Sequence, residues 1–178
     1  MCQFNHKWLL VSLWISVMGF MVPITQADDC LATGHIEIPN SSLFSFKQVK
    51  KLGEPLEVTF NVTFSGENCV QSSEEVDIYI ALQMPSHEDK SSELWYLQPS
   101  GEFSDNMTAY LTKLQAQNRK VTIFSGVLPQ NIESVGQYTF YAGVVPAKTP
   151  IDRVLEVVGN PHEMSSLSVE GLFVTRVN

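Results

Sequence analysis

Residues 55–66 read PLEVTFNVTFSG, and apolar and polar side chains alternate through nine consecutive positions of this stretch. The apolar series is Leu56, Val58, Phe60, Val62 and Phe64, and the polar series between them is Glu57, Thr59, Asn61 and Thr63. A period of two, rich in β-branched and aromatic residues, is typical of a strand that buries one face. We therefore predict a strand whose apolar series faces a core and whose polar series faces solvent.

The chain on both sides of this strand repeats the same kind of pattern. Residues 76–84, VDIYIALQM, alternate again and end at Pro85, which has no N–H to donate to a β-ladder. Further strands are predicted at residues 35–38, 43–46, 94–97, 108–112, 120–128, 137–145 and 171–177. Many short strands separated by turn signals indicate an all-β, antiparallel sandwich, with a closed barrel as the alternative architecture.

Helical spacing occurs in one stretch, residues 150–159, which read PIDRVLEVVG. Ile151, Val154, Leu155 and Val158 fall on one stripe of a helix with that register. A stripe of this width is typical of a short helix that packs on other structure. We predict one short helix in a connection between strands.

The first 27 residues differ in kind from the rest. Lys7 precedes an uncharged apolar run at residues 8–22, and Thr25, Gln26 and Ala27 follow it. This order is typical of a secretory signal peptide. The run has 15 residues, whereas a membrane-spanning helix needs about 20, which disfavours the alternative of an uncleaved anchor. We expect a signal peptide at 1–27, a single β-sandwich domain at 28–178 and no membrane span after cleavage.

The charge balance is acidic and becomes more so if the leader is removed. The 178 residues include 19 Asp and Glu against 11 Lys and Arg, for a formal charge of −8. Removing 27 residues leaves 151 and takes away Lys7, so the charge becomes −9. Binding to nucleic acid needs a concentrated basic surface, so we expect no nucleic-acid partner. The protein is expected in the periplasm, at the cell surface or outside the cell.

Cys2 lies in the leader, so Cys30 and Cys69 are the cysteines of the predicted domain. Export to an oxidising compartment makes a disulfide between these two the expected state. The alternative is a pair of free thiols.

Acidic residues gather around the start of the second strand. Glu74, Glu75 and Asp77 lie there, and Glu88 lies in the following loop. Loop carboxylates of a sandwich can converge on calcium or form the acid and base of a glycosidase, and a solvated acidic edge is the alternative to both. The sequence has no G-x-S-x-G, P-loop, G-x-G-x-x-G or EF-hand pattern. We therefore expect no catalytic residues, no metal and no cofactor.

Aromatic residues are the second group of candidates. Trp95, Tyr96, Tyr110 and Tyr141 are predicted as a binding surface, because exposed rings suit sugar stacking or a protein interface. Strand alternation puts Tyr141 on the opposite face from Phe140. The alternative is that most of these rings fill the core.

Three strings resemble a module that recurs in secreted bacterial proteins: VDIYIALQMP at 76–85, LWYLQPSGEF at 94–103 and GQYTFYAGVVP at 136–146. The matching residues are Val76, Asp77, Tyr79, Ala81, Leu82, Pro85, Leu94, Leu97, Gly101, Leu128, Pro129, Gly136, Tyr138, Thr139, Phe140, Tyr141 and Ala142. Gly136-x-Tyr138 also resembles the tyrosine corner of immunoglobulin-type domains. The resemblance implies an Ig-like extracytoplasmic β-sandwich of unknown function and brings no catalytic residues.

Together these observations favour an exported, noncatalytic module that binds a protein or a surface glycan through sheet edges or loop tips. The first alternative is a small secreted hydrolase that uses Glu74, Glu75, Asp77 or Glu88. The second alternative is a calcium-dependent adhesion module.

The leader prediction has a direct test. If the full chain is expressed in a host that exports it, the recovered protein is expected to begin at Asp28, as intact-mass analysis or N-terminal sequencing would read it. A recovered protein that still carries residues 8–22 would contradict cleavage and favour the anchor.

Overall fold

The computed structural model describes residues 30–39, 42–44, 47–66, 69, 74–85, 94–127, 135–158, 160 and 164–176, so the predicted leader, Glu88, Leu128 and Pro129 lie outside the described residues. The elements in chain order are β1 (Leu31–Glu37), β2 (Ser42–Phe44), β3 (Lys47–Lys51), β4 (Pro55–Ser65), β5 (Glu75–Gln83), β6 (Leu94–Leu97), β7 (Phe103–Ser104), β8 (Leu111–Gln115), β9 (Arg119–Val127), β10 (Gly136–Pro146), the 3-10 turn η3 (Ile151–Arg153), α1 (Val154–Val157) and β11 (Ser166–Thr175). None of the helices described is long and apolar enough to cross a membrane.

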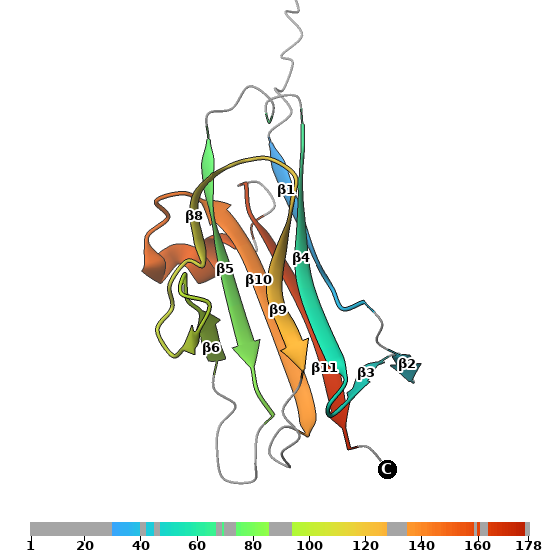
Figure 1. Cartoon of the computed structure of the whole chain (residues 1–178). Helices are drawn as coiled ribbons and strands as arrows, with labels where there is room; N and C mark the ends of the chain where they lie inside the picture. Colours follow the sequence, from blue (N-terminus) through green and yellow to red (C-terminus); the bar gives the residue numbers. More distant parts are fainter. Residues whose placement is uncertain are drawn as a thin grey trace, which may run out of the picture.

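The strands form two sheets that pack face to face (Figure 1). The smaller sheet has the order β1-β4-β9, and the larger has the order β2-β3-β11-β10-β5-β6-β7, with β8 also paired to β5. Within the described residues no ladder joins the sheets, so the architecture is a sandwich and the alternative of a closed barrel is wrong. The predicted fold class, an all-β Ig-like sandwich with one short helix in a connection, is confirmed.

The core lies between the sheets and comes mainly from the alternating strands. Phe60 of β4 and Ile36 of β1 are fully buried from the smaller sheet, and Ile78 and Ile80 of β5 meet them from the larger one. Burying each such side chain stabilises the fold by about 1.5–3 kcal/mol relative to leaving it exposed. The two strands with the strictest alternation in the sequence therefore supply the centre of the core.

Thr59 corrects one part of the β4 prediction, because this residue of the polar series is fully buried. Thr59 lies on the outer side of the smaller sheet, where its neighbours on the adjacent strands are Glu37 of β1 and Thr122 of β9. Lys120 Nζ of β9 lies 3.6 Å from Glu37 Oε2, so this ion pair reaches across β4. Two long charged side chains from the neighbouring strands explain why a residue on the outer face has no access to solvent.

Several strand predictions differ from the structure: the first strand begins at Leu31 rather than at residue 35, and β3 and β7 were not predicted. The strand expected at 108–112 is β8, Leu111–Gln115, and the last strand begins at Ser166 rather than at residue 171. The pairing of β3 with β11 is parallel, whereas an all-antiparallel sandwich was predicted. Residue periodicity indicates an extended chain but does not indicate which strand lies beside it, and this is why the parallel pair was missed.

The helical segment lies where it was predicted but with a different buried stripe. Val154, Val157 and Val158 are buried, whereas Ile151 and Leu155 are 54% and 72% exposed. The segment begins as a 3-10 turn before α1, and a 3-10 turn has three residues per turn instead of 3.6. The predicted stripe assumed a continuous α-helix and therefore placed Ile151 and Leu155 on the wrong side.

One edge of the sandwich is closed by serine side chains. The amides of Gly34 and Ile36 in β1 donate to Ser166 Oγ and Ser168 Oγ of β11, at 2.8 and 3.0 Å. Because β11 uses side chains here, these bonds join the two sheets without a shared backbone ladder. We call this contact the β1–β11 seam. The packing of the Phe60 ring against β1 also requires a glycine at position 34, since a Cβ on Gly34 would lie 2.5 Å from Cε2 of Phe60.

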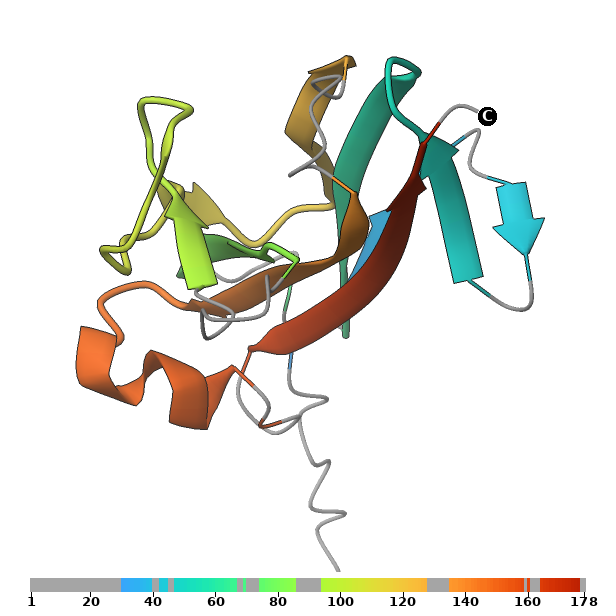
Figure 2. The ribbon, with the colours of Figure 1, turned by 90° about the horizontal axis from the view of Figure 1, so that it is seen from below.

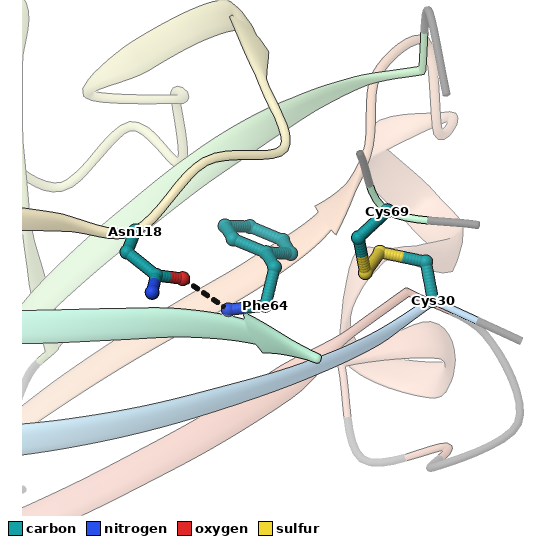
Figure 3. The surroundings of a disulfide bond; sticks show 4 residues. All are labelled: Cys30, Phe64, Cys69 and Asn118. Carbon is teal, nitrogen blue, oxygen red and sulfur yellow. Dashed lines mark hydrogen bonds between the residues drawn. A yellow bond between two sulfur atoms is a disulfide. The ribbon is translucent and has the colours of Figure 1, made fainter. Parts of the chain in front are cut away.

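The predicted disulfide between Cys30 and Cys69 is present and lies at the start of β1 (Figure 3). It ties β1 to the segment that follows β4, with a Cα–Cα distance of 4.9 Å. Next to it, the amide of Phe64 donates to Asn118 Oδ1 at 2.7 Å, which holds the turn before β9 against the end of β4. The disulfide and the seam therefore act on the same strand.

The seam gives a prediction for stability. Changing Ser168 to Ala would leave the buried Ile36 amide without its acceptor, so we expect the free energy of unfolding to fall by about 1–2 kcal/mol in urea titrations. Changing Ser125 to Ala on the exposed surface of β9 is the matched control and should alter the free energy by less than about 0.5 kcal/mol. Equal effects from the two variants would contradict a stabilising seam.

Candidate functional site

The candidate site is the outer face of the larger sheet, the side that points away from the core. Strand register aligns four residues in one row across β6, β5, β10 and β11: Tyr96, Ala81, Tyr141 and Val169. Residues directly opposite each other on neighbouring strands share a face. The small side chain of Ala81 therefore lies between two tyrosines, and Val169 continues the row onto β11.

Tyr141 is held along this surface by a side-chain contact. Its hydroxyl lies 3.0 Å from Oε1 of Gln83, to which it donates, and Gln83 belongs to the neighbouring strand β5. The backbone partner of Tyr141 is Ala81, so the bond to Gln83 runs diagonally across the two strands. This geometry directs the Tyr141 side chain from β10 toward β5 along the sheet.

The strand β11 has an inverted pattern. Leu167, Val169 and Phe173 point outward and are 48%, 50% and 37% exposed, whereas Ser166 and Ser168 point toward the seam. Exposed apolar residues at alternating positions of one strand form a continuous strip, which a soluble protein normally avoids unless the strip is used. The strand predicted from the sequence began at residue 171 and therefore did not include Leu167 and Val169.

On β5, β10 and β11 the outward positions between Tyr79 and Phe173 carry no charged residue, whereas Lys51 of the adjoining strand β3 lies on the same face opposite Thr175. These positions on β5, β10 and β11 are Tyr79, Ala81, Gln83, Gln137, Thr139, Tyr141, Gly143, Leu167, Val169, Gly171 and Phe173. The chain as a whole has a formal charge of −8. A surface without charges on an acidic protein resembles the centre of an interface, where charged residues are depleted.

The helical segment covers one end of the face (Figure 2). Val158 packs on Gly143 of β10, where a Cβ would lie 2.5 Å from Val158 Cγ2. Val145, Val154, Val157 and Val158 form a second small core there, with Tyr79 and Met107 packed against it. The rest of the strip along β11 has no described helix above it. The outer face thus has a raised end at the helix and a flat end toward Phe173.

The four predicted aromatic residues divide between the two sides of the sheet. Tyr96 and Tyr141 share the outer row. Trp95 lies opposite Leu82 and so faces the core side of β6, and Tyr110 packs against the main core. The binding surface stays a prediction: Tyr96 and Tyr141 share one face of the sheet, whereas Tyr110 packs against the main core and Trp95 lies on the opposite side of β6 from Tyr96.

The predicted acidic group is also divided. Glu74 and Glu75 are exposed, but Asp77 is buried and its Oδ1 accepts from the amide of Lys113 at 2.8 Å. Lys113 has a φ of 53°, so the carboxylate stabilises a backbone conformation that most residues avoid. In the described part of the chain, no three His, Cys, Asp or Glu side chains are placed to hold a metal ion.

A cavity of about 330 Å³ lies between the starts of β1 and β11 and the end of the helical segment. Its lining residues are Leu31, Ala32, Thr33, Val158, Ser165, Ser166 and Leu167. No carboxylate and no aromatic ring belongs to this lining. The cavity does not bring together the residues that the hydrolase alternative requires.

Comparisons with known proteins give no family. No protein-family model matches the chain, and no curated protein matches it. Among solved structures, the crystal structure of the CARDB domain of the PF1109 protein from Pyrococcus furiosus, in complex with di-metal ions, has 14% identity and a TM-score of 0.42, and the match covers 84% of this chain and 90% of that domain. A solution structure of the same domain has 17% identity and a TM-score of 0.39, covering 82% and 95%. Spo0M, a sporulation control protein from Bacillus subtilis, has 11% identity and a TM-score of 0.37, covering 83% of this chain and 50% of Spo0M. Similarities at this level assign no ligand or function to the chain.

The environment of Tyr79 predicts a dependence of stability on alkaline pH. Burial raises the pKa of the Tyr79 phenol above its usual value of 10.0, and the negative charge of Asp77 raises the pKa further. Above pH 10 the phenol ionises in the unfolded chain before it ionises in the folded one, so this contribution to stability is present below pH 10 and is lost as the pH rises through the folded-state pKa.

We therefore expect the free energy of unfolding of the wild type to fall more steeply between about pH 9 and pH 11 than that of Tyr79→Phe, in urea titrations at each pH. Tyr110→Phe is the matched control. Identical pH profiles for the wild type and Tyr79→Phe would contradict the raised pKa.

Proposed function

We propose that this chain is an exported, noncatalytic β-sandwich module that binds another protein through the outer face of its larger sheet. The observation that carries the proposal is the inverted pattern of β11, in which Val169 and its apolar neighbours face solvent while serines face inward. Aliphatic side chains on a flat uncharged surface gain free energy when a partner removes them from water. The sequence analysis predicted binding through sheet edges or loop tips, and we propose this sheet face in their place.

The exposed edge strand of the smaller sheet, β9, supports a binding surface on a sheet face rather than on a sheet edge. β9 has no second ladder partner among the described strands, and its register shifts opposite Val58 and Thr59. It also carries Arg119 and Lys120 at its start. Bulges and basic residues are the devices by which edge strands avoid pairing with other chains.

A surface glycan is the second candidate ligand, and the tyrosine row favours it. Tyr96 and Tyr141 are two strand spacings apart, roughly 9.5 Å, with Ala81 between them. Tyrosine rings beside an amide such as Gln83 can combine stacking with hydrogen bonds to hydroxyl groups.

The hydrolase and calcium alternatives receive less support. Asp77 is buried and engaged by a backbone amide, and Glu88 lies outside the described residues. A pair of carboxylates beside a concave site is what either chemistry would need, and the described cavity has none.

The proposal is tested with purified wild-type chain, two face variants and one control. Val169→Ser removes an exposed side chain from the β11 strip, and Tyr141→Ser removes a ring from the tyrosine row. Val127→Ser is the control, because Val127 is 60% exposed on β9 of the other sheet. The four proteins are compared in pull-downs from cell-surface extract and on a glycan array.

We expect binding that survives Val127→Ser and is reduced at least about 10-fold by a face variant, since losing a buried aliphatic contact costs about 1.4 kcal/mol or more. A protein ligand should respond most to Val169→Ser and a glycan most to Tyr141→Ser. Binding that neither face variant changes would place the ligand elsewhere and refute the proposal.

A further inference from the structure

The β1–β11 seam stops one step short of the start of β1. Its two hydrogen bonds advance by two residues on both strands, in the same direction. One such step back from Gly34 and Ser166 brings Ala32 opposite residue 164. That residue is Met164, which has no hydroxyl group and is buried in the core. Ala32 therefore lacks the serine acceptor that the next two amides of the series have.

Strand register shows which way the backbone of Ala32 points. Opposite residues of an antiparallel ladder either exchange both hydrogen bonds or direct their backbone groups away from each other. The partner of Ala32 is Phe64 of β4, and the amide of Phe64 donates to Asn118 on the far side of β4, so this pair is of the second kind. The N–H and C=O of Ala32 thus point away from β4, and neither has a hydrogen-bond partner among the described residues.

The first part of β11 has a second unpaired edge. Thr175 O accepts from the amide of Leu52, on the side of β11 away from β10. The register of β11 with β10 is continuous, so every second residue back from Thr175 directs its backbone to that same side. Leu167 is one of these residues, and β3 pairs along this edge only from Leu172 onward. The N–H and C=O of Leu167 therefore have no ladder partner among the described strands.

The cavity beside the seam lies where these two edges begin. Ala32 and Leu167 both line it, and its volume of about 330 Å³ is at the small end of the range for ligand sites, about 300–1,000 Å³. Leu31 and Leu167 of the lining are 44% and 48% exposed, so apolar surface is accessible there. The disulfide between Cys30 and Cys69 fixes the start of β1 next to this lining (Figure 3). The edge of β1 is thereby held in place before a ligand binds.

We propose that this cavity binds an extended peptide segment of another protein, whose main chain pairs with Ala32 as an added strand and whose apolar side chains contact Leu31 and Val158. Each unpaired backbone position offers a donor and an acceptor, which is the pattern that a peptide main chain complements at a sheet edge. A carboxylate has acceptors only, so it would leave the carbonyls of Ala32 and Leu167 without donors. The described lining residues carry no charge, which favours an uncharged segment.

The paired stretch is short. The seam serines already accept the amides of Gly34 and Ile36, so on β1 an added strand has access only to the backbone around Ala32. Few main-chain bonds and a small apolar contact give weak binding, and we expect a dissociation constant of about 100 μM.

The first test uses an array of synthetic hexapeptides, acetylated at the N-terminus and amidated at the C-terminus, with uncharged side chains and varied apolar positions. Peptides that bind the exported, purified chain are titrated into the ¹⁵N-labelled protein and followed by NMR. We expect the amide signals of Ala32 and Leu167 to shift and hydrogen exchange at Ala32 to slow. Methylating the amides of a bound peptide one at a time should weaken binding about 10-fold at alternate positions, because only those amides face β1.

The second test uses variants of the chain. Ala32→Pro removes an N–H from the free edge without removing a bond to β4 and should weaken binding about 10-fold. Leu31→Ser removes an exposed apolar contact and should weaken binding about 5-fold. Leu94→Ser is its matched control, because Leu94 is 42% exposed on β6 and outside the cavity. Val169→Ser, on the outer face of the larger sheet, should also leave peptide binding unchanged, and circular dichroism establishes that each variant folds.

Three results would overturn the inference. The first is an array in which no peptide binds at about 1 mM. The second is binding that both Leu31→Ser and Ala32→Pro leave unchanged, or that methylation weakens at no position, since strand pairing at this edge would then be absent. The third uses hexanoate as the probe for a small carboxylate: signals of Ala32 that shift with hexanoate and with no peptide would assign the cavity to that class of ligand.

Discussion

The hydroxyl groups of Ser166 and Ser168 are the contact on which the arrangement of this sandwich depends. They accept the amides of Gly34 and Ile36, which point away from β4 and would otherwise lack acceptors at a buried edge. An unsatisfied buried amide costs about 1–3 kcal/mol, so losing the acceptor of the buried Ile36 would remove a sizeable part of the stability of a domain this size. The disulfide between Cys30 and Cys69 anchors the same strand at its start.

The seam also determines what the other side of β11 presents. Side chains alternate along a strand, so turning Ser166 and Ser168 inward turns Leu167 and Val169 outward. In the first part of β11 the polar residues face inward, because this part supplies acceptors to β1, whereas Leu172 and Val174 further along the strand face the core in the usual way. The apolar strip is thus a geometric consequence of the seam as well as a surface available for binding.

Sequence patterns predicted those parts of the fold in which apolar residues are buried and polar residues are exposed. The β4 series from Leu56 to Val62 and the cysteine pair follow from such patterns and are confirmed. The row that joins Tyr96 to Tyr141 depends on which strands lie side by side, and strand pairing is a long-range property that periodicity does not carry. The strip on β11 was missed for a different reason, since the predicted strand began at residue 171 and left out Leu167 and Val169. Asp77 was predicted as part of an acidic site. Its burial could not be predicted from the sequence pattern, because it depends on a hydrogen bond from the Lys113 amide of the neighbouring strand β8.

Side chains of β11 hold β1 at the edge of the sandwich and thereby turn Leu167 and Val169 to solvent. Amide hydrogen exchange at Gly34 and Ile36, measured by NMR on the folded protein, tests this most directly. We predict that both amides exchange slowly, at rates similar to those of amides paired in the β4 ladder, and that Ser168→Ala accelerates exchange at Ile36. Exchange at both positions as fast as in an exposed edge strand would contradict it.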